Sequence, residues 1–280
     1  MQSPSPARAE HYVRDAADPR MLSRALADLG GGWRLRRLAW ALAWLDTRNR
    51  YRGSVFGPFW LTFTTAAMVG GLGLLYSTLL KLELRDYLPF LAVSLILWNM
   101  LAQIANEACL TFTNAEAIIR QMRLPYTVHV LRIVFRNAIS AAHSLPLILL
   151  VFLLCGHLPG PEAVLAVPGL MLVAVCALSG ALLLGMLCAR FRDIPPIVAN
   201  VMQLAFFMSP VLWKPELLGA GQRWLFLNPF YVVMEVVRGP LVEGGAPLAI
   251  WAAAVFFTAA LAVLAGVFFV RFRARLAFWI

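Results

Sequence analysis

The sequence predicts an all-α integral membrane protein with six transmembrane helices. Hydrophobic residues make up 61% of the 280 positions and charged residues 14%, with a mean hydropathy of +0.76, whereas a soluble domain carries about 25% charged residues. Six apolar runs approach or exceed the roughly 20 residues that a helix needs to cross a bilayer. Arginines gather between these runs, so we attribute the net charge of +10 to membrane anchoring rather than to nucleic-acid binding.

The N-terminal part of the chain is predicted to stay outside the bilayer core. Residues 1–32 are polar and end in three glycines, which favours a flexible cytoplasmic tail; they lack the apolar core and cleavage site of a signal peptide. Residues 33–52 are predicted to form an interfacial amphipathic helix, because leucines and tryptophans occupy two arcs with arginines between them. Trp33, Trp40 and Trp44 are either an interfacial belt or an aromatic rail for a sugar or lipid head group.

The first span, about 54–80, fixes the orientation of the rest. The cationic run from Arg48 to Arg52 ends at Gly53, after which Ser54 can cap the helix and Pro58 can occupy its first turn. Arginines that directly precede an apolar span stay cytoplasmic, and 19 of the 24 Lys and Arg residues fall on the inner side that this rule assigns. Both termini are therefore predicted to be cytoplasmic.

The second span, about 87–112, and the third, about 128–155, each carry a polar face. On the second span this face holds Asn99, Gln103, Asn106 and Glu107. On the third it runs along the inner half and includes Arg132 and Arg136. An unpaired charge inside the membrane is costly, so Arg136 is predicted to pair with Glu107, while Arg132 either pairs or extends toward the interface.

The fourth span, about 163–189, and the fifth, about 195–213, are joined by a short basic loop, and the sixth covers about 247–270. Before the sixth span, residues 214–246 are too long for a hairpin loop. The helix signals in this segment are Asn228 as a cap, Pro229 at the first position and Gly239-Pro240 as a terminator. We expect short re-entrant or interfacial helices here on the outer side, with Glu235 and Arg238 spaced to pair.

Catalytic and metal-binding patterns are missing from the sequence. It has no GxxxxGK[ST] phosphate loop, no GxSxG elbow, no HExxH pair and no CxxC, and its four cysteines lack metal-ligand spacing. His129 and His143 share a helix face but lie too far apart for one metal, and no nucleophile accompanies them. We therefore predict no catalytic residues, no metal and no enzyme activity.

Several stretches together resemble a known family. In order, these are RYRGSVFGPFW, YLPFLAVSLILWNML, IIRQMRLP, ARFRDIPPIV and LNPFYVVMEVVRGPL. They resemble the membrane subunit of polysaccharide-exporting ABC transporters, which move O-antigen, capsule or teichoic-acid chains, and the resemblance covers about residues 40–275. One departure is RYRGS, where a second basic residue is common before the serine; this weakens a phosphate-binding role at that position.

The resemblance implies a passive transport subunit in the bacterial inner membrane. Two copies of this chain would pair with two copies of a cytoplasmic ATPase, which binds ATP and Mg, and would export an undecaprenyl-diphosphate-linked polysaccharide such as O-antigen. The coupling surface for the ATPase would include Asn114, Glu116, Arg120, Arg123, Arg190, Arg192 and Asp193. The outer gate would include Asn228, Pro229 and Arg238.

The cargo suggests which residues meet it. An arginine fork matches a diphosphate, and the candidates are Arg50, Arg52, Arg132 and Arg136. A hydrated sugar path would be lined by Trp33, Trp40, Trp44, Tyr87, Trp98, Asn99, Gln103, Asn106, Asn200 and Gln203. The amides in this set could instead make interhelical hydrogen bonds within one subunit. Two other functions remain open: export of a drug or small lipid on the same fold, and a membrane-embedded glycosyl- or acyltransferase.

Overall fold

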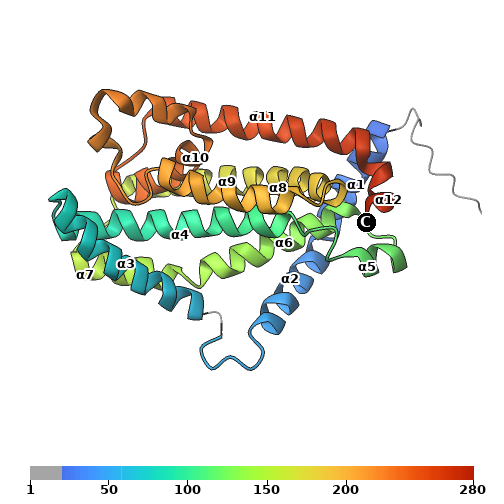
Figure 1. The fold of residues 1–280 in the computed structure, drawn as a ribbon, viewed down its shortest axis with the longest axis horizontal. Helices are drawn as coiled ribbons and strands as arrows, with labels where there is room; N and C mark the ends of the chain where they lie inside the picture. The colour runs from blue at the N-terminus through green and yellow to red at the C-terminus, as the bar shows by residue number, and fades with distance from the viewer. Residues whose placement is uncertain (1–20, 58) are drawn as a thin grey trace, which may run out of the picture.

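The protein is helical throughout the part of the chain that the computed structural model describes, residues 21–57 and 59–280 (Figure 1). The longer helices are α1 (Met21–Arg34), α2 (Arg36–Arg50), α3 (Phe59–Leu80), α4 (Leu84–Ala108), α6 (Tyr126–Ala142), α7 (Leu145–Cys155), α8 (Ala166–Arg190), α9 (Ile194–Met208), α10 (Pro229–Arg238) and α11 (Leu248–Phe272). Shorter ones are α5 (Glu116–Gln121), η1 (Pro161–Leu165), η2 (Pro215–Leu227), η3 (Gly239–Glu243), η4 (Arg273–Arg275) and α12 (Leu276–Trp279).

Five helical stretches are long and apolar enough to cross a membrane. They are Phe59–Leu80, Leu84–Ala108, Tyr126–Cys155, Pro161–Arg190 and Leu248–Trp279. A sixth candidate is the pair formed by η2 with α10 and η3, which is bent by 108° at the break between them. The chain is thus a multi-pass membrane protein with five to six candidate spans.

The predicted fifth span is shorter than expected. Its helix, α9, has 15 residues and ends at Met208, five residues before the predicted end of the span. Ser209 adopts an extended conformation with ψ of 146°, as is usual for a residue that precedes proline, here Pro210. At 1.5 Å per residue, α9 falls short of the roughly 30 Å of a hydrocarbon core.

The third span is broken near its middle. Helix α6 ends at Ala142 and α7 begins at Leu145, because Pro146 lacks an N–H group and its ring would clash with the preceding turn of a continuous helix. The Thr62 hydroxyl on α3 donates a hydrogen bond of 2.8 Å to the carbonyl of His143 in this break. A neighbouring helix thus satisfies a backbone group that the proline frees.

The N-terminal region differs from the prediction. Residues 1–20 lie outside the described part, but the expected flexible tail is wrong for residues 21–32, which belong to α1. All three glycines of the predicted linker are helical. Packing explains this: a Cβ at Gly32 would lie 2.6 Å from the Cβ of Thr127, so glycine lets α1 approach the start of α6 closely. The predicted helix at 33–52 is divided, with Trp33 in α1 and the remainder in α2.

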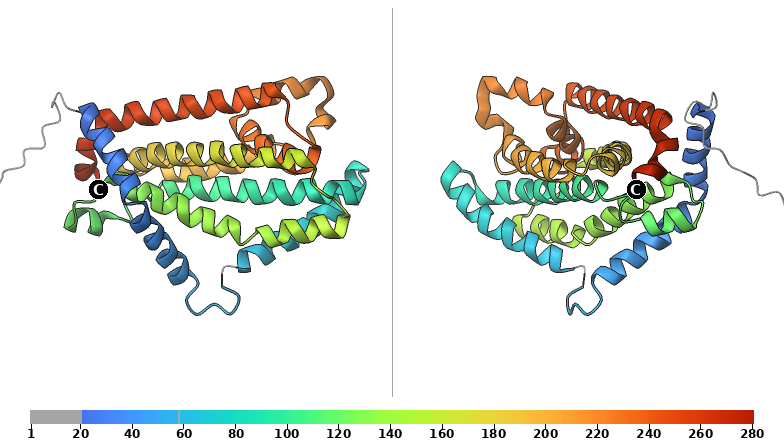
Figure 2. Two further views of the ribbon diagram at one scale, coloured as in Figure 1. Left: turned by 180° about the vertical axis from the view of Figure 1, so that it is seen from behind. Right: turned by 45° about the vertical axis from the view of Figure 1, so that its right-hand side comes forward.

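Helix α4 forms the centre of the core. Nearly every residue between Tyr87 and Trp98 is buried, and α4 packs against α3, α6, α7, α8, α9 and α10. The views of Figures 1 and 2 agree that α4 passes through the middle of the bundle, while α2 and α3 diverge from it as a V with the 51–57 loop at its tip. Helix α5, α12 and the C-terminus lie at one end of the bundle, and η2 and α10 lie toward the other.

The helix predicted between the last two spans is present as α10. The Asn228 side chain caps it by accepting hydrogen bonds from the backbone N–H groups of Phe230 (3.0 Å) and Tyr231 (3.3 Å). Helix α10 ends at Arg238 with Gly239 as its C-cap residue, as the Gly239-Pro240 signal predicted, but the chain continues as the π-helix η3 and turns only at Gly244, with φ of +73°.

Candidate functional site: an ion-pair cluster joining α2, α4 and α6

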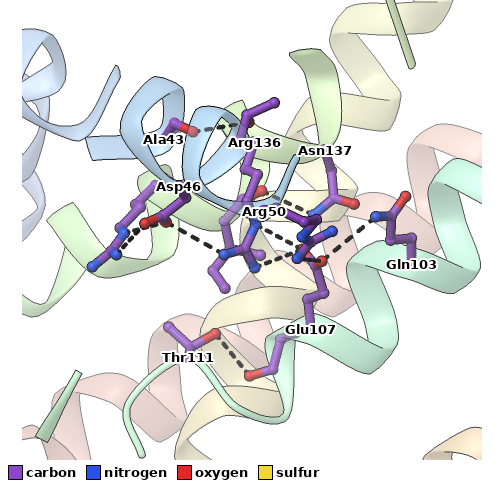
Figure 3. Close-up of polar contacts among 12 residues, drawn as sticks. Ala43, Asp46, Arg50, Gln103, Glu107, Thr111, Arg136 and Asn137 are labelled. Atoms are coloured by element: carbon purple, nitrogen blue, oxygen red, sulfur yellow. Dashed lines mark hydrogen bonds and ion pairs between the residues drawn. The ribbon is translucent and has the colours of Figure 1, made fainter. Parts of the chain in front are cut away.

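Five charged side chains meet where α2, α4 and α6 come together. Asp46 and Arg50 come from α2, Glu107 from the end of α4, and Arg132 and Arg136 from α6. The two charged residues on α2 are four positions apart, as are the two on α6, so each pair lies on one face of its helix. We call these five residues the ion-pair cluster (Figure 3).

Glu107 is the hub of the ion-pair cluster (Figure 3). Its Oε2 accepts hydrogen bonds from Arg136 Nη2 (2.7 Å), Arg136 Nε (3.1 Å) and Asn137 Nδ2 (2.7 Å). Its Oε1 accepts from Arg50 Nη2 at 2.6 Å, with the amide of Gln103 at 3.5 Å. The predicted pair between Arg136 and Glu107 is confirmed. The contact from Arg50 was not foreseen.

Asp46 holds α2 against α6. Its Oδ2 and Oδ1 accept from Arg132 Nε (2.6 Å) and Nη2 (2.5 Å), which is a bidentate fork, and Arg136 Nη1 lies 3.3 Å from Oδ2. Of the two alternatives for Arg132, the structure therefore shows pairing. Sequence reasoning missed Asp46, although it is the only acidic residue in the predicted amphipathic helix and faces the polar side of α6.

The ion-pair cluster has a net charge of +1, from three arginines and two carboxylates. Burial lowers the pKa of Arg50, but the hydrogen bond and the charge of Glu107 more than offset this and leave that pKa above its ordinary value. Arg50 is the most accessible member, with 39% of its side chain exposed against 15% for Arg136 and Glu107. A group with an excess positive charge and one exposed arginine can attract an anion while keeping its inner charges paired.

The fourth arginine predicted to meet a diphosphate lies apart from the ion-pair cluster. Arg52 is exposed in the 51–57 loop, and its side chain makes no ion pair with the described residues.

The residues predicted to line a sugar path are divided among several environments. The rings of Trp33, Trp40 and Trp44 are exposed, although Trp40 also contacts Phe135 edge-on at 5.6 Å. Tyr87 and Trp98 are buried inside the subunit: the Tyr87 hydroxyl donates to the carbonyl of Leu212, and Trp98 packs between two phenylalanines. In this conformation, therefore, these two rings contribute to the core rather than to an open surface.

The amides are similarly separated. Asn99 and Gln103 border a small cavity of about 10 Å³ with residues of α3 and α6, and Asn99 Nδ2 lies 3.4 Å from Thr65 Oγ1. Of the two predictions for Asn99, the structure therefore supports an interhelical hydrogen bond within one subunit. Asn106, Asn200 and Gln203 are exposed on α4 and α9.

Arg238, a predicted gate residue, is fully buried. It forms an ion pair with Glu235, as the spacing predicted, and donates to Ser94 Oγ (2.9 Å) and the Pro210 carbonyl (2.6 Å). Its guanidinium carbon lies 4.2 Å from the ring centre of Phe90. Arg238 therefore ties α10 to α4 and to the segment after α9. Pro229 is exposed at the first position of α10.

The residues predicted for ATPase coupling gather at the bundle end that holds α5 and the C-terminus (Figure 1). Arg120 on α5 pairs with Glu116 at 2.7 Å and donates to the carbonyl of Ile280 at 3.0 Å. Arg190 lies over the ring of Trp279 at 5.9 Å. The remaining members, all exposed, are Asn114, Arg123, Arg192 and Asp193.

No group of three or more His, Cys, Asp or Glu side chains that could hold a metal ion occurs among residues 21–57 and 59–280. His129 is buried on α6, whereas His143 Nδ1 lies 2.7 Å from the carbonyl of Ile139.

A comparison with known families decides the class of the protein. Residues 37–242 match the model described as ABC-2 type transporter, which is more than half of the chain. The chain belongs to the ABC-2 type transporter family. An ABC-2 membrane domain is a transport subunit rather than an enzyme, and the helices of this one provide its membrane spans.

Three curated relatives of this ABC-2 protein carry the same description, O-antigen export system permease protein. The O-antigen export system permease protein RfbA of Myxococcus xanthus is 24% identical over 218 residues, covering 77% of this chain and 84% of that protein. Two proteins of the same name from Klebsiella pneumoniae are 22% and 21% identical, and cover 66% and 71% of this chain and 72% and 78% of their own lengths.

Proposed function

We propose that this ABC-2 protein is the membrane subunit of an ATP-driven exporter of lipid-linked polysaccharide, with O-antigen as the cargo. The observation that carries the proposal is the match of nearly the whole membrane domain to O-antigen export permeases, at 84% of the length of the Myxococcus relative. The chain has no phosphate loop of its own. A separate ATPase therefore supplies the energy.

The ATPase docks at the end of the bundle that holds α5. Three features support this: α5 is a short helix with exposed charges, Arg190 and Arg192 lie in the neighbouring loop, and the arginine-rich end of α11 is at the same end. Basic residues beside spans favour the cytoplasmic side. We place this end in the cytoplasm of the bacterial inner membrane, with both termini inside and with α9 and the bent pair together completing six crossings.

Two copies of the chain form the transport path. Asn200 and Gln203 are exposed on α9, and polar amides facing lipid would be costly. A second copy of the chain that covers α9 would place these amides along a shared route for sugar. The exposed tryptophans of α1 and α2 then lie where a lipid-linked glycan enters from the inner leaflet, which is the depth that tryptophan prefers.

Deleting the gene and measuring surface polysaccharide tests this function. Loss of surface O-antigen, with lipid-linked chains retained in the inner membrane and both restored by the wild-type gene, is expected. Normal surface polysaccharide in the deletion strain would rule out the proposed cargo. A matched biochemical test uses the purified chain alone, which should not hydrolyse ATP. Hydrolysis without a partner would contradict the proposal that a separate subunit hydrolyses ATP.

A further inference from the structure

The contact between Asp46 and Arg132 has the geometry with which an arginine binds a phosphate. Two carboxylate oxygens receive two parallel N–H bonds of 2.6 and 2.5 Å from one edge of the guanidinium. Arginine binds phosphate through the same fork, with two phosphate oxygens in place of the carboxylate oxygens. Asp46 comes from α2, the amphipathic helix, and Arg132 comes from the third span.

The ion-pair cluster holds α2 at two points. Asp46 connects it to Arg132 and Arg136 on α6, and Arg50 connects it to Glu107 on α4. If α2 moved away, Arg136 would keep Glu107 as its partner. Arg132 has no other ion pair among the described residues, and only 22% of its side chain is exposed. A partly buried arginine without a partner is unstable, so another anion would have to replace Asp46.

We propose that Asp46 occupies the place of a phosphate on Arg132, and that a polyprenyl diphosphate opens the contact between α2 and α6 by exchanging with it. This inference rests on the proposed function, because it takes the head group of the lipid-linked cargo as the incoming anion. Asp46 keeps Arg132 paired while no cargo is present. A diphosphate brings more negative charge than one carboxylate and can bind Arg132 and Arg136 together, so it competes effectively for the fork.

The test is a binding measurement on the full chain in nanodiscs of phosphatidylcholine, with farnesyl diphosphate as the probe. Asp46→Asn removes the competing charge with little change in shape. Farnesyl diphosphate should bind about five- to tenfold more tightly to this variant, the factor expected for losing one competing ion pair. Asp86→Asn, the same change at an exposed site in the first turn of α4, at the opposite end of that helix from Glu107, is the matched control and should leave the affinity unchanged.

A second variant separates ligand exchange from a structural role. The double change Asp46→Arg with Arg132→Asp restores an ion pair between α2 and α6 in reversed order. Compared with Arg132→Asp alone, it should recover part of the lost melting temperature, and only part because Arg136 then faces a cation at position 46, but it should not recover farnesyl diphosphate binding. A swapped variant that binds like the wild type would show that the pair is structural only, and would overturn the proposal.

Two further probes identify the anion. Tighter binding of inorganic diphosphate to Asp46→Asn than to the wild type supports recognition of the diphosphate group itself. A gain for phosphatidylglycerol without a gain for either diphosphate would overturn the assignment. If Asp46→Asn binds farnesyl diphosphate no more tightly than the wild type does, the exchange is rejected but the proposed exporter function is not. If the gene deletion leaves surface O-antigen normal, the exporter function is rejected, and the affinity gain in Asp46→Asn can still be measured.

Discussion

Asp28 on α1 caps the first turn of α6, a helix that begins almost one hundred residues later. Its carboxylate accepts hydrogen bonds from the backbone N–H groups of Tyr126 (3.2 Å) and Thr127 (3.1 Å) and from the Thr127 hydroxyl. It also pairs with Arg273, just past the end of α11, at 2.9 Å. One buried side chain thus joins the N-terminal helix to the neighbouring ends of two candidate spans.

Asp28→Ala is therefore expected to destabilise the protein. Two backbone donors and one arginine lose their acceptor, which costs roughly 2–4 kcal/mol in the free energy of unfolding. Thermal unfolding in detergent, followed by tryptophan fluorescence, measures the loss. Asp193→Ala is the control, because Asp193 is exposed and caps no helix with its side chain. Equal melting temperatures for the two variants would contradict this role of Asp28.

Gly30 and Gly32, two residues apart on α1, are expected to respond oppositely to alanine. A Cβ at Gly32 meets Thr127 at 2.6 Å, so Gly32→Ala should separate α1 from α6 at a cost of about 1–3 kcal/mol. A Cβ at Gly30 meets nothing within 4 Å, so Gly30→Ala should stabilise the helix by about 0.5–1 kcal/mol. Melting temperatures that shift in the same direction would mean that α1 does not pack in this way.

Reversing the charge of Arg136 should impair folding, and a compensating change at Glu107 should restore it only in part. Arg136→Glu places a third carboxylate beside those of Glu107 and Asp46, at a loss of roughly 3–5 kcal/mol. Adding Glu107→Arg restores the pair, but Arg50 and Asn137 then face a cation instead of the carboxylate they now contact. The amount of folded protein in membranes measures rescue. Full rescue would show that the contacts of Arg50 and Asn137 contribute little. No rescue would show that Arg136 and Glu107 do not form a stabilising pair.

Arg238 offers a test of a buried ion pair. Arg238→Met leaves Glu235 charged and unpaired in the core, which should cost roughly 3–5 kcal/mol. The double change with Glu235→Leu removes both charges and should recover most of that loss, because apolar replacements of a buried pair are often neutral. Resistance to unfolding by detergent and urea gives both values. A double variant no better than the single one would indicate that the bonds to Ser94 and Pro210 dominate.

The sequence predicted most of the spans and two ion pairs, Arg136 with Glu107 and Glu235 with Arg238, but not the arrangement of the N-terminal region. Apolar runs identify spans because a bilayer requires length and hydrophobicity that can be counted along the chain. Three consecutive glycines predict a linker, and only the close approach to Thr127 makes them helical. Asp46 was missed for a similar reason, since its partners are 86 and 90 residues away and nothing local marks them.

Leu35 is the single residue between α1 and α2. Because Asp28 fixes α1 to the start of α6, α2 cannot slide lengthwise along the third span without breaking the cap of that span. Any movement of α2 away from α6 would therefore have to be a rotation about Leu35, in which the far end of α2, with Arg50, would travel farthest and Trp33 would stay in place.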